Sequence, residues 1–178
     1  MLTRLPEFVD PWRLADQRKS FSGQEKVGNL PRLCGFLARP DGEVAYELRF
    51  GRGEGRWPRI MGWVRTTLNL ECQRCLGELE IPVDAMLDLA VIEVLDEAET
   101  LPDACEPVLA EDGRVRLLDI IEDELLLAVP QVPRHEMGVC EGAAQGVVAD
   151  QDGADTERIT VPDSPFAVLS GIKTKRNN

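Results

Sequence analysis

The sequence predicts an α+β fold in which an antiparallel β-sheet meander packs against one main helix. Apolar side chains alternate with polar ones along much of residues 43–95, which is the period of strands that bury one face. These segments follow one another through short loops, which favours antiparallel neighbours. Residues 119–129 carry a one-sided apolar stripe, typical of a helix that covers a sheet.

Short helices are expected before the sheet. Asp10-Pro11 begins the first, because aspartate is a good N-cap and proline suits the first helical position. Asn29-Leu30-Pro31 begins a second, which precedes the turn residues Pro40-Asp41-Gly42. The rest of residues 5–28 mixes charge with few apolar residues, and we assign no further element to it.

Three strands make up the predicted sheet, at residues 43–50, 59–71 and 78–95. The last of them is broken or bent near Pro82. Between the first two, Gly51–Gly55 matches G-x-G-x-G but does not lead from a strand into a helix. A loop is therefore favoured there over a phosphate-binding turn.

Residues 96–113 are acidic and contain two prolines, so they are expected to form a loop. In the main helix that follows, we expect Ile120, Ile121 and Leu125 to face the core. Asp119 and Glu122 fit a capping arrangement. The acidic side chains on the other side of this helix are expected to be solvated: Asp119, Glu122 and Asp123.

We divide the chain into a folded domain at 1–140, a flexible acidic linker at 141–163 and a short amphipathic basic tail at 164–178. The linker contains Gly, Ala, Asp and Gln with little apolar content. In the tail, three apolar side chains fall on one side of a short helix: Phe166, Leu169 and Ile172. About nine residues do not hold a helix alone in water, so the tail is expected to dock either on its own domain or on a partner. We predict that Phe166, Leu169 and Ile172 bind a partner.

Composition excludes several classes of protein. The chain has 178 residues, a mass of 19.8 kDa and a net charge of −12. No apolar run approaches the roughly 20 residues of a membrane span, and the N-terminus has no apolar stretch typical of a secretory signal. A cytoplasmic protein is therefore expected.

Charge is distributed unevenly along the chain. Residues 1–75 have a balance of +4, whereas residues 76–170 hold 4 Lys/Arg and 23 Asp/Glu, a balance of −19. The acidic half either keeps the protein in solution or binds a basic partner. The N-terminal half allows a local basic contact.

Two segments carry cysteine and histidine at metal-ligand spacing. Cys72 and Cys75 form Cys-x2-Cys, and His135 and Cys140 form His-x4-Cys. Two close pairs of nitrogen and sulfur ligands are what tetrahedral zinc requires, so these four residues are the candidate zinc ligands. A site closed by four protein ligands would be structural.

Other interpretations of these cysteines stay open. Buried or reduced thiols are a common use of cysteine, and redox chemistry is disfavoured because the Cys-x2-Cys pair ends a strand. An odd count of five cysteines argues against a disulfide framework. Cys34 is expected in the core, and Cys105, which lies in an acidic loop, is assigned no chemistry.

Arginines and tryptophans accompany the strands. Arg52, Arg56, Arg59 and Arg74 are candidate RNA contacts, because arginine beside aromatic rings binds single-stranded RNA. The alternative, slightly favoured, is that the tryptophans are core residues and the arginines line a sheet face. Enzyme patterns are sparse: Glu122, Asp123 and Glu124 offer acid/base carboxylates, although such a cluster is more often a solvated helix face.

The chain resembles the large ribosomal RNA subunit accumulation protein family, YceD, over residues 66–173. The segments that carry the resemblance occur in the family's order: Leu70–Cys75, Ile121–Pro130, Val132–His135, Cys140 and Ser164–Leu169. Asp10-Pro11 is also similar. The chain departs from the family pattern at Ser164, where asparagine is usual, and in its Gly- and Ala-rich linker.

The resemblance implies a bacterial cytoplasmic protein that promotes synthesis, processing or accumulation of 23S ribosomal RNA. It implies no catalytic residues, because family members are not established enzymes. A non-catalytic factor would bind precursor 23S rRNA or a basic ribosomal or processing protein, and the −19 segment suits a basic partner. The alternative is a metal-dependent RNA-processing enzyme that uses clustered carboxylates.

Overall fold

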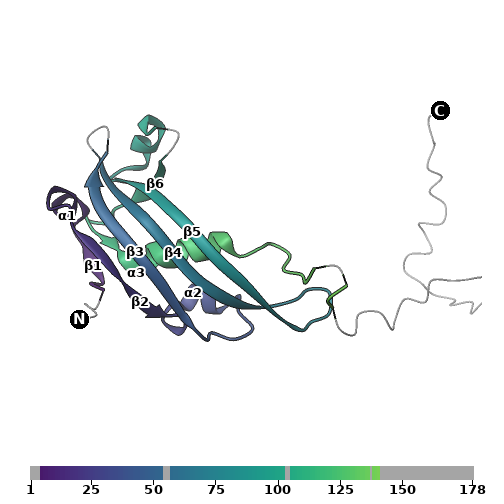
Figure 1. Ribbon diagram of the computed structural model, residues 1–178. Coiled ribbons are helices and arrows are strands. Elements are labelled where there is room, and N and C mark those ends of the chain that lie inside the picture. The colour runs from purple at the N-terminus through teal and green to yellow at the C-terminus, as the bar shows by residue number, and fades with distance from the viewer. Residues whose placement is uncertain (1–4, 54–56, 103–104, 137, 141–178) are drawn as a thin grey trace, which may run out of the picture. The chain divides into compact units, whose positions relative to one another are not determined.

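A computed structural model describes residues 5–53, 57–102, 105–136 and 138–140 (Figure 1). The strands are β1 (Phe8–Val9), β2 (Ser20–Lys26), β3 (Glu43–Arg52), β4 (Pro58–Glu71), β5 (Glu78–Ile92), β6 (Glu106–Leu109) and β7 (Val115–Arg116). The helices are α1 (Pro11–Asp16), α2 (Pro31–Cys34) and α3 (Leu117–Ala128), with 3₁₀ turns η1 (Val27–Asn29) and η2 (Leu95–Thr100). No helix in these ranges is long and apolar enough to cross a membrane.

The main sheet has five strands in the order β2-β3-β4-β5-β6, and β1 pairs with β7 in a separate ribbon. Strands β2 to β5 pair antiparallel in chain order, which confirms the α+β fold with a meander. The inward side chains of β3 are those that alternate in the sequence, and all are buried: Val44, Tyr46, Leu48 and Phe50.

Two edge strands were not expected from the sequence. Strand β2 lies within the segment to which no strand was assigned, and it carries one large apolar residue, Phe21. Strand β6 pairs parallel with β5 inside the expected loop at 96–113, which also contains η2. Edge strands bury little and tolerate proline, here Pro107, so their sequences lack the period of a central strand.

Helix α3 crosses the inner face of the sheet, as the sequence predicts (Figure 1). Its buried side chains include Leu117, Ile120, Ile121 and Leu125. The predicted capping arrangement is wrong, because the N-cap is Arg116 and makes no side-chain capping bond. Asp119 instead accepts a hydrogen bond from the Arg116 guanidinium at 3.0 Å.

Glu122 is also not the solvated residue that was expected, because only 2% of it is exposed. Its carboxylate accepts hydrogen bonds from the backbone N–H groups of Arg32 at 2.7 Å and Leu33 at 3.1 Å. It also pairs with Nε of Arg32 at 2.8 Å. Helix α2 has no capping side chain of its own, so a carboxylate from α3 caps it.

Helix α1 begins as predicted, with the Asp10 carboxylate accepting the Arg13 N–H at 3.0 Å. It ends in a Schellman motif: N–H of Lys19 bonds to the Leu14 carbonyl and N–H of Arg18 bonds to the Ala15 carbonyl. Arg18 has a φ of +49° at the position where glycine is preferred. A left-handed conformation costs a residue with a side chain roughly 1 kcal/mol.

Candidate metal centre

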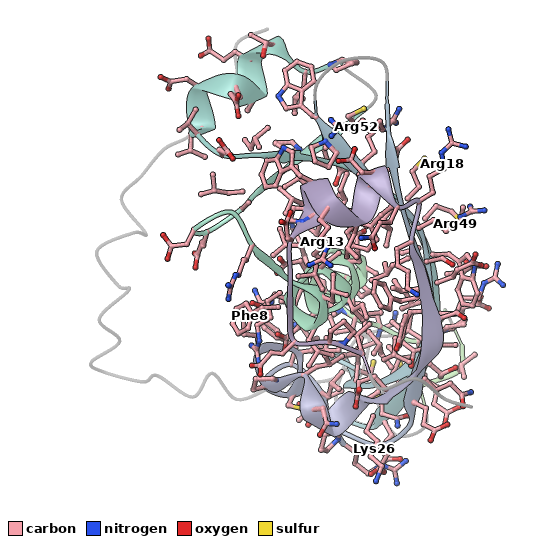
Figure 2. All side chains as sticks on the ribbon, turned by 90° about the vertical axis from the view of Figure 1, so that its left-hand side faces the viewer. Phe8, Arg13, Arg18, Lys26, Arg49 and Arg52 are labelled. Carbon is pink, nitrogen blue, oxygen red and sulfur yellow. The ribbon has the colours of Figure 1, made fainter. Side chains whose placement is uncertain are left out.

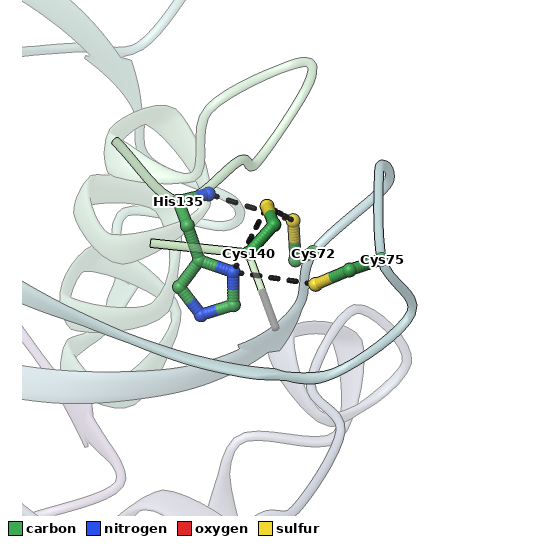
Figure 3. Close-up of side chains that lie close together, drawn as sticks. All are labelled: Cys72, Cys75, His135 and Cys140. Carbon is green, nitrogen blue, oxygen red and sulfur yellow. Dashed lines mark hydrogen bonds between the residues drawn. The ribbon is translucent and has the colours of Figure 1, made fainter. Parts of the chain in front are cut away.

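The first half of the site is the turn that joins β4 to β5. Cys72 directly follows β4, and the turn is closed by hydrogen bonds from N–H of Cys72 to the Gly77 carbonyl and from N–H of Leu76 to the Cys72 carbonyl. Leu76 has a φ of +59°, so this residue takes the left-handed position in the turn and Gly77 does not. The turn brings the thiols of Cys72 and Cys75 to the same side (Figure 3).

The second half is the segment after α3, which runs back beside this turn. N–H of Gln73 donates to the Pro133 carbonyl at 2.9 Å, and Arg74 donates to the His135 carbonyl at 3.3 Å. N–H of His135 approaches the Cys72 sulfur at 3.5 Å. These bonds dock the two segments and place His135 and Cys140 against the turn.

The four predicted ligands converge, with all their ligand atoms within 4.8 Å of one another (Figure 3). Nδ1 of His135 lies 3.4 Å from Sγ of Cys75 and 3.7 Å from Sγ of Cys140. The sulfurs of Cys72 and Cys140 are 3.8 Å apart, far longer than a disulfide bond. A zinc tetrahedron has edges of about 3.8 Å between sulfurs and about 3.5 Å between sulfur and nitrogen, so the residues fit the metal.

His135 is oriented for ligation through Nδ1. Its Nε2 lies 2.9 Å from the Glu78 carbonyl, at the first residue of β5. That carbonyl is an acceptor, so it holds the proton on Nε2 and leaves the Nδ1 lone pair facing the sulfurs. A backbone carbonyl on the outer ring nitrogen is a common feature of histidines that bind metals.

The thiols have different electrostatic environments. Burial opposes ionisation of Cys72, but the backbone N–H groups of Cys75, His135 and Arg74 lower its pKa to about 5. Burial and the neighbouring thiols of Cys75 and Cys72 raise the pKa of Cys140 to about 11. A divalent cation at the centre would remove this cost of placing several thiolates together.

The other cysteines are outside this cluster. Cys34 is half-buried, and its thiol lies 3.5 Å from the Val27 carbonyl. Cys105 is half-buried just before β6. The Cys-x2-Cys pair follows a strand and does not begin a helix, which disfavours the redox interpretation.

Of the three candidate RNA-contacting arginines that the structure describes, Arg52 and Arg59 lie at the same end of the β3–β4 pair, whereas Arg74 lies beyond the other end. Arg52 bonds to Asp16 at 2.7 Å, and Arg59 pairs with Asp88 on β5. Arg74 lies beyond the far end of β4, roughly 40 Å of strand from Arg59. Arg56 is outside the described residues, as are the tail residues Phe166, Leu169 and Ile172.

Two tryptophans lie apart from the hydrophobic core, contrary to the favoured expectation. Trp57 and Trp63 are half-buried and do not belong to the core cluster, whereas Trp12 packs against it. Trp63 lies on the outer face of β4, where its indole donates to Glu47 at 3.1 Å and Arg65 stacks 4.6 Å from the ring centroid. The arginines on this face include Arg65, which pairs with Asp84.

Three of the four carboxylates of α3 form ion pairs with arginines. Glu122 and Asp123 both pair with Arg32, and Asp119 pairs with Arg116. Glu124, which is on the other side of the helix, has a raised pKa because of burial and the nearby Glu106 and Asp123 carboxylates. Among the His, Cys, Asp and Glu side chains in the described ranges, one group could hold a metal ion: Cys72, Cys75, His135 and Cys140.

Comparison with known proteins places these features in a family. Residues 60–173 match the family described as "Large ribosomal RNA subunit accumulation protein YceD". A Haemophilus influenzae protein named "Large ribosomal RNA subunit accumulation protein YceD" is 31% identical over 173 residues, which cover 97% of this chain and 98% of that protein. No solved structure matches the chain.

Proposed function

Because the chain belongs to the YceD family of large ribosomal RNA subunit accumulation proteins, we propose that it promotes accumulation of 23S ribosomal RNA as a non-catalytic factor. The relative that covers almost the whole chain is named a large ribosomal RNA subunit accumulation protein, and this is the observation on which the proposal rests. The protein would act in the bacterial cytoplasm by binding precursor 23S rRNA or a basic ribosomal or processing protein.

The metal centre has a structural role in this proposal. Cys72, Cys75, His135 and Cys140 would supply all four ligands of one zinc ion. The ion would cross-link the β4–β5 turn to the segment after α3. Without it, a few hydrogen bonds hold these two segments together. No coordination position would remain for a substrate.

The arginine pairing of the α3 carboxylates supports a binding role over metal-dependent RNA processing. A nuclease of that type needs several free carboxylates around its cations. Glu122 is buried and already accepts three hydrogen bonds from Arg32 and Leu33, so it has no accessible oxygen to offer a metal.

The tail is proposed as a second, separable contact. The family match extends to residue 173 and therefore includes Phe166, Leu169 and Ile172. We propose that these side chains bind the assembly partner, joined by residues 141–163 to the domain at 1–140. Replacing Phe166 and Leu169 with alanine should weaken partner retention and leave the melting temperature of the domain nearly unchanged; a fall of several degrees would show that the tail belongs to the domain's core.

The test is complementation in a bacterium that lacks its own YceD protein. The ratio of 23S to 16S rRNA should fall in the deleted strain and return to normal when the full chain is expressed. The Cys75→Ser variant should restore the ratio poorly, whereas Cys34→Ser should restore it fully, because Cys34 is outside the cluster. An unrestored ratio with well-expressed wild-type chain would refute the proposal.

A separate incubation tests the non-catalytic part. Purified chain is added to precursor 23S rRNA with and without magnesium. We expect intact RNA in both samples, whereas magnesium-dependent cleavage would establish the enzymatic alternative.

A further inference from the structure

A basic hollow lies at the α1 end of the sheet, far from the metal centre. It has a volume of about 550 Å³, and three arginines line it: Arg18, Arg49 and Arg52. Arg18 comes from the end of α1, and the other two come from β3. Figure 2 shows them near α1, whereas Lys26 lies at the opposite end of the same face.

The hollow has an excess of positive charge although the chain as a whole has a net charge of −12. Arg52 bonds to Asp16 at 2.7 Å and Arg49 approaches Glu47 at 3.7 Å, so these two arginines are partly compensated. In the part of the chain that the structure describes, the exposed side chain of Arg18 has no ion-pair partner. The same is true of the exposed Lys19, which follows Arg18 in the chain but does not line the hollow. Arg18 within the hollow and Lys19 next to it in sequence therefore remain available to an anion.

The backbone at Arg18 indicates that this cation has a use other than stability. Arg18 occupies the left-handed position of the α1 Schellman motif, with a φ of +49°, where glycine would be unstrained. Its exposed side chain makes no compensating contact among the described residues. Strain that the fold does not need is typical of functional positions.

The surface next to the hollow suits nucleic-acid bases. Met61 lines the hollow, and Trp63 lies two residues further along the same outer face of β4. The partner of Trp63 across the strands is Met86, which is 71% exposed. Phosphate-binding arginines beside an aromatic and apolar surface are the combination that binds single-stranded RNA.

We propose that Arg18, Lys19, Arg49 and Arg52 bind the phosphate backbone of single-stranded RNA, with the bases lying over Met61 and Trp63. This inference rests on the proposed function and names the contact surface for the rRNA. Of the arginines that the sequence suggested as RNA contacts, the proposed surface includes Arg52 and does not include Arg59 or Arg74.

The test uses the full chain and a fluorescently labelled single-stranded fragment of 23S rRNA, with binding measured by anisotropy from 50 to 200 mM salt. The triple variant Arg18→Glu, Lys19→Glu and Arg49→Glu should bind at least about tenfold more weakly. The slope of log K against log salt should become shallower by about two units, at roughly 0.7 for each of the three lost phosphate contacts. The control variant makes the same change in charge at exposed residues away from the hollow and from Trp63: Lys26→Glu, Arg39→Glu and Arg114→Glu. It should bind within about twofold of wild type.

Arg18→Gly separates binding from folding. It should weaken RNA binding while the melting temperature stays the same or rises, because glycine relieves the left-handed strain. A purely structural role for Arg18 predicts no loss of RNA binding. The proposal is overturned if the triple variant and its control bind RNA equally, or if wild-type chain binds no RNA and only an acidic protein recognises the hollow.

The two proposals fail in different ways. If the triple variant restores the 23S to 16S ratio in cells as well as wild type does, the surface is wrong and the proposed function stands. If the wild-type chain itself does not restore the ratio, the proposed function fails whatever the hollow binds.

Discussion

Replacing Glu122 with alanine should be among the most destabilising single changes in the domain. Its carboxylate caps the N-terminus of α2 through N–H of Arg32 and N–H of Leu33, and it pairs with the Arg32 side chain. Leu33 is fully buried, so water cannot replace the lost acceptor at its N–H group. The contact also raises the pKa of Arg32 above its ordinary value, mainly through the hydrogen bond to Glu122.

The magnitude follows from the groups left without partners. An unsatisfied buried donor costs about 1–3 kcal/mol, and two backbone N–H groups lose their acceptor. The Arg32 side chain is 48% exposed, so water solvates it after the change and its ion pair adds little. We therefore expect a loss of about 2–4 kcal/mol, or roughly 10 °C in melting temperature for a domain of this size.

Urea unfolding followed by circular dichroism measures this loss. Asp123→Asn is the matched control, because Asp123 pairs with the same arginine but is 57% exposed, and it should cost less than about 1 kcal/mol. If Glu122→Ala and Asp123→Asn have the same small effect, the assignment of Glu122 as the α2 cap is refuted.

Three further predictions concern the backbone and one buried hydroxyl. Leu76→Gly should stabilise the fold by about 0.5–1 kcal/mol in urea unfolding, because Leu76 has a φ of +59° and is exposed; a loss of stability would contradict the turn geometry. Gly62→Ala should destabilise by more than about 2 kcal/mol, since a Cβ there would overlap the Glu47 carbonyl on β3, and an unchanged melting temperature would refute that close approach. Burial and the Glu25 carboxylate raise the pKa of Tyr46 above 10.0, so the neutral hydroxyl contributes fully to the free energy of unfolding below pH 10, and that contribution is lost as the pH rises through the raised pKa. Tyr46→Phe should therefore lose less stability than wild type between pH 10 and more alkaline pH. Equal falls in the free energy of unfolding for both chains would count against this burial of the hydroxyl.

The central strands were predictable from sequence because each buries one face. Val44 to Phe50 on β3 and Ile60 to Leu70 on β4 alternate in apolarity, because one side of each strand faces the hydrophobic core and the other faces outward. The edge strands β2 and β6 bury too little to leave such a period, so the sequence did not reveal them.

The ligand residues were predictable, but their docking was not. Residue spacing identified the pairs 72/75 and 135/140, because each pair is local in the chain. Their convergence depends on the register in which Gln73 meets Pro133, which is set by the packing of α3. Glu122 was misassigned for the same reason: its burial depends on α2, some 90 residues away in sequence.

Zinc content tests the metal centre most directly. Full-length chain purified under reducing conditions should contain about one zinc ion, and X-ray absorption should show a shell of sulfur at about 2.3 Å with one nitrogen at about 2.0 Å. Cys34→Ser should retain the zinc and Cys75→Ser should lose it. Wild-type chain that binds no zinc when reduced and supplied with it, or a Cys75→Ser variant that keeps a full equivalent, would contradict the account.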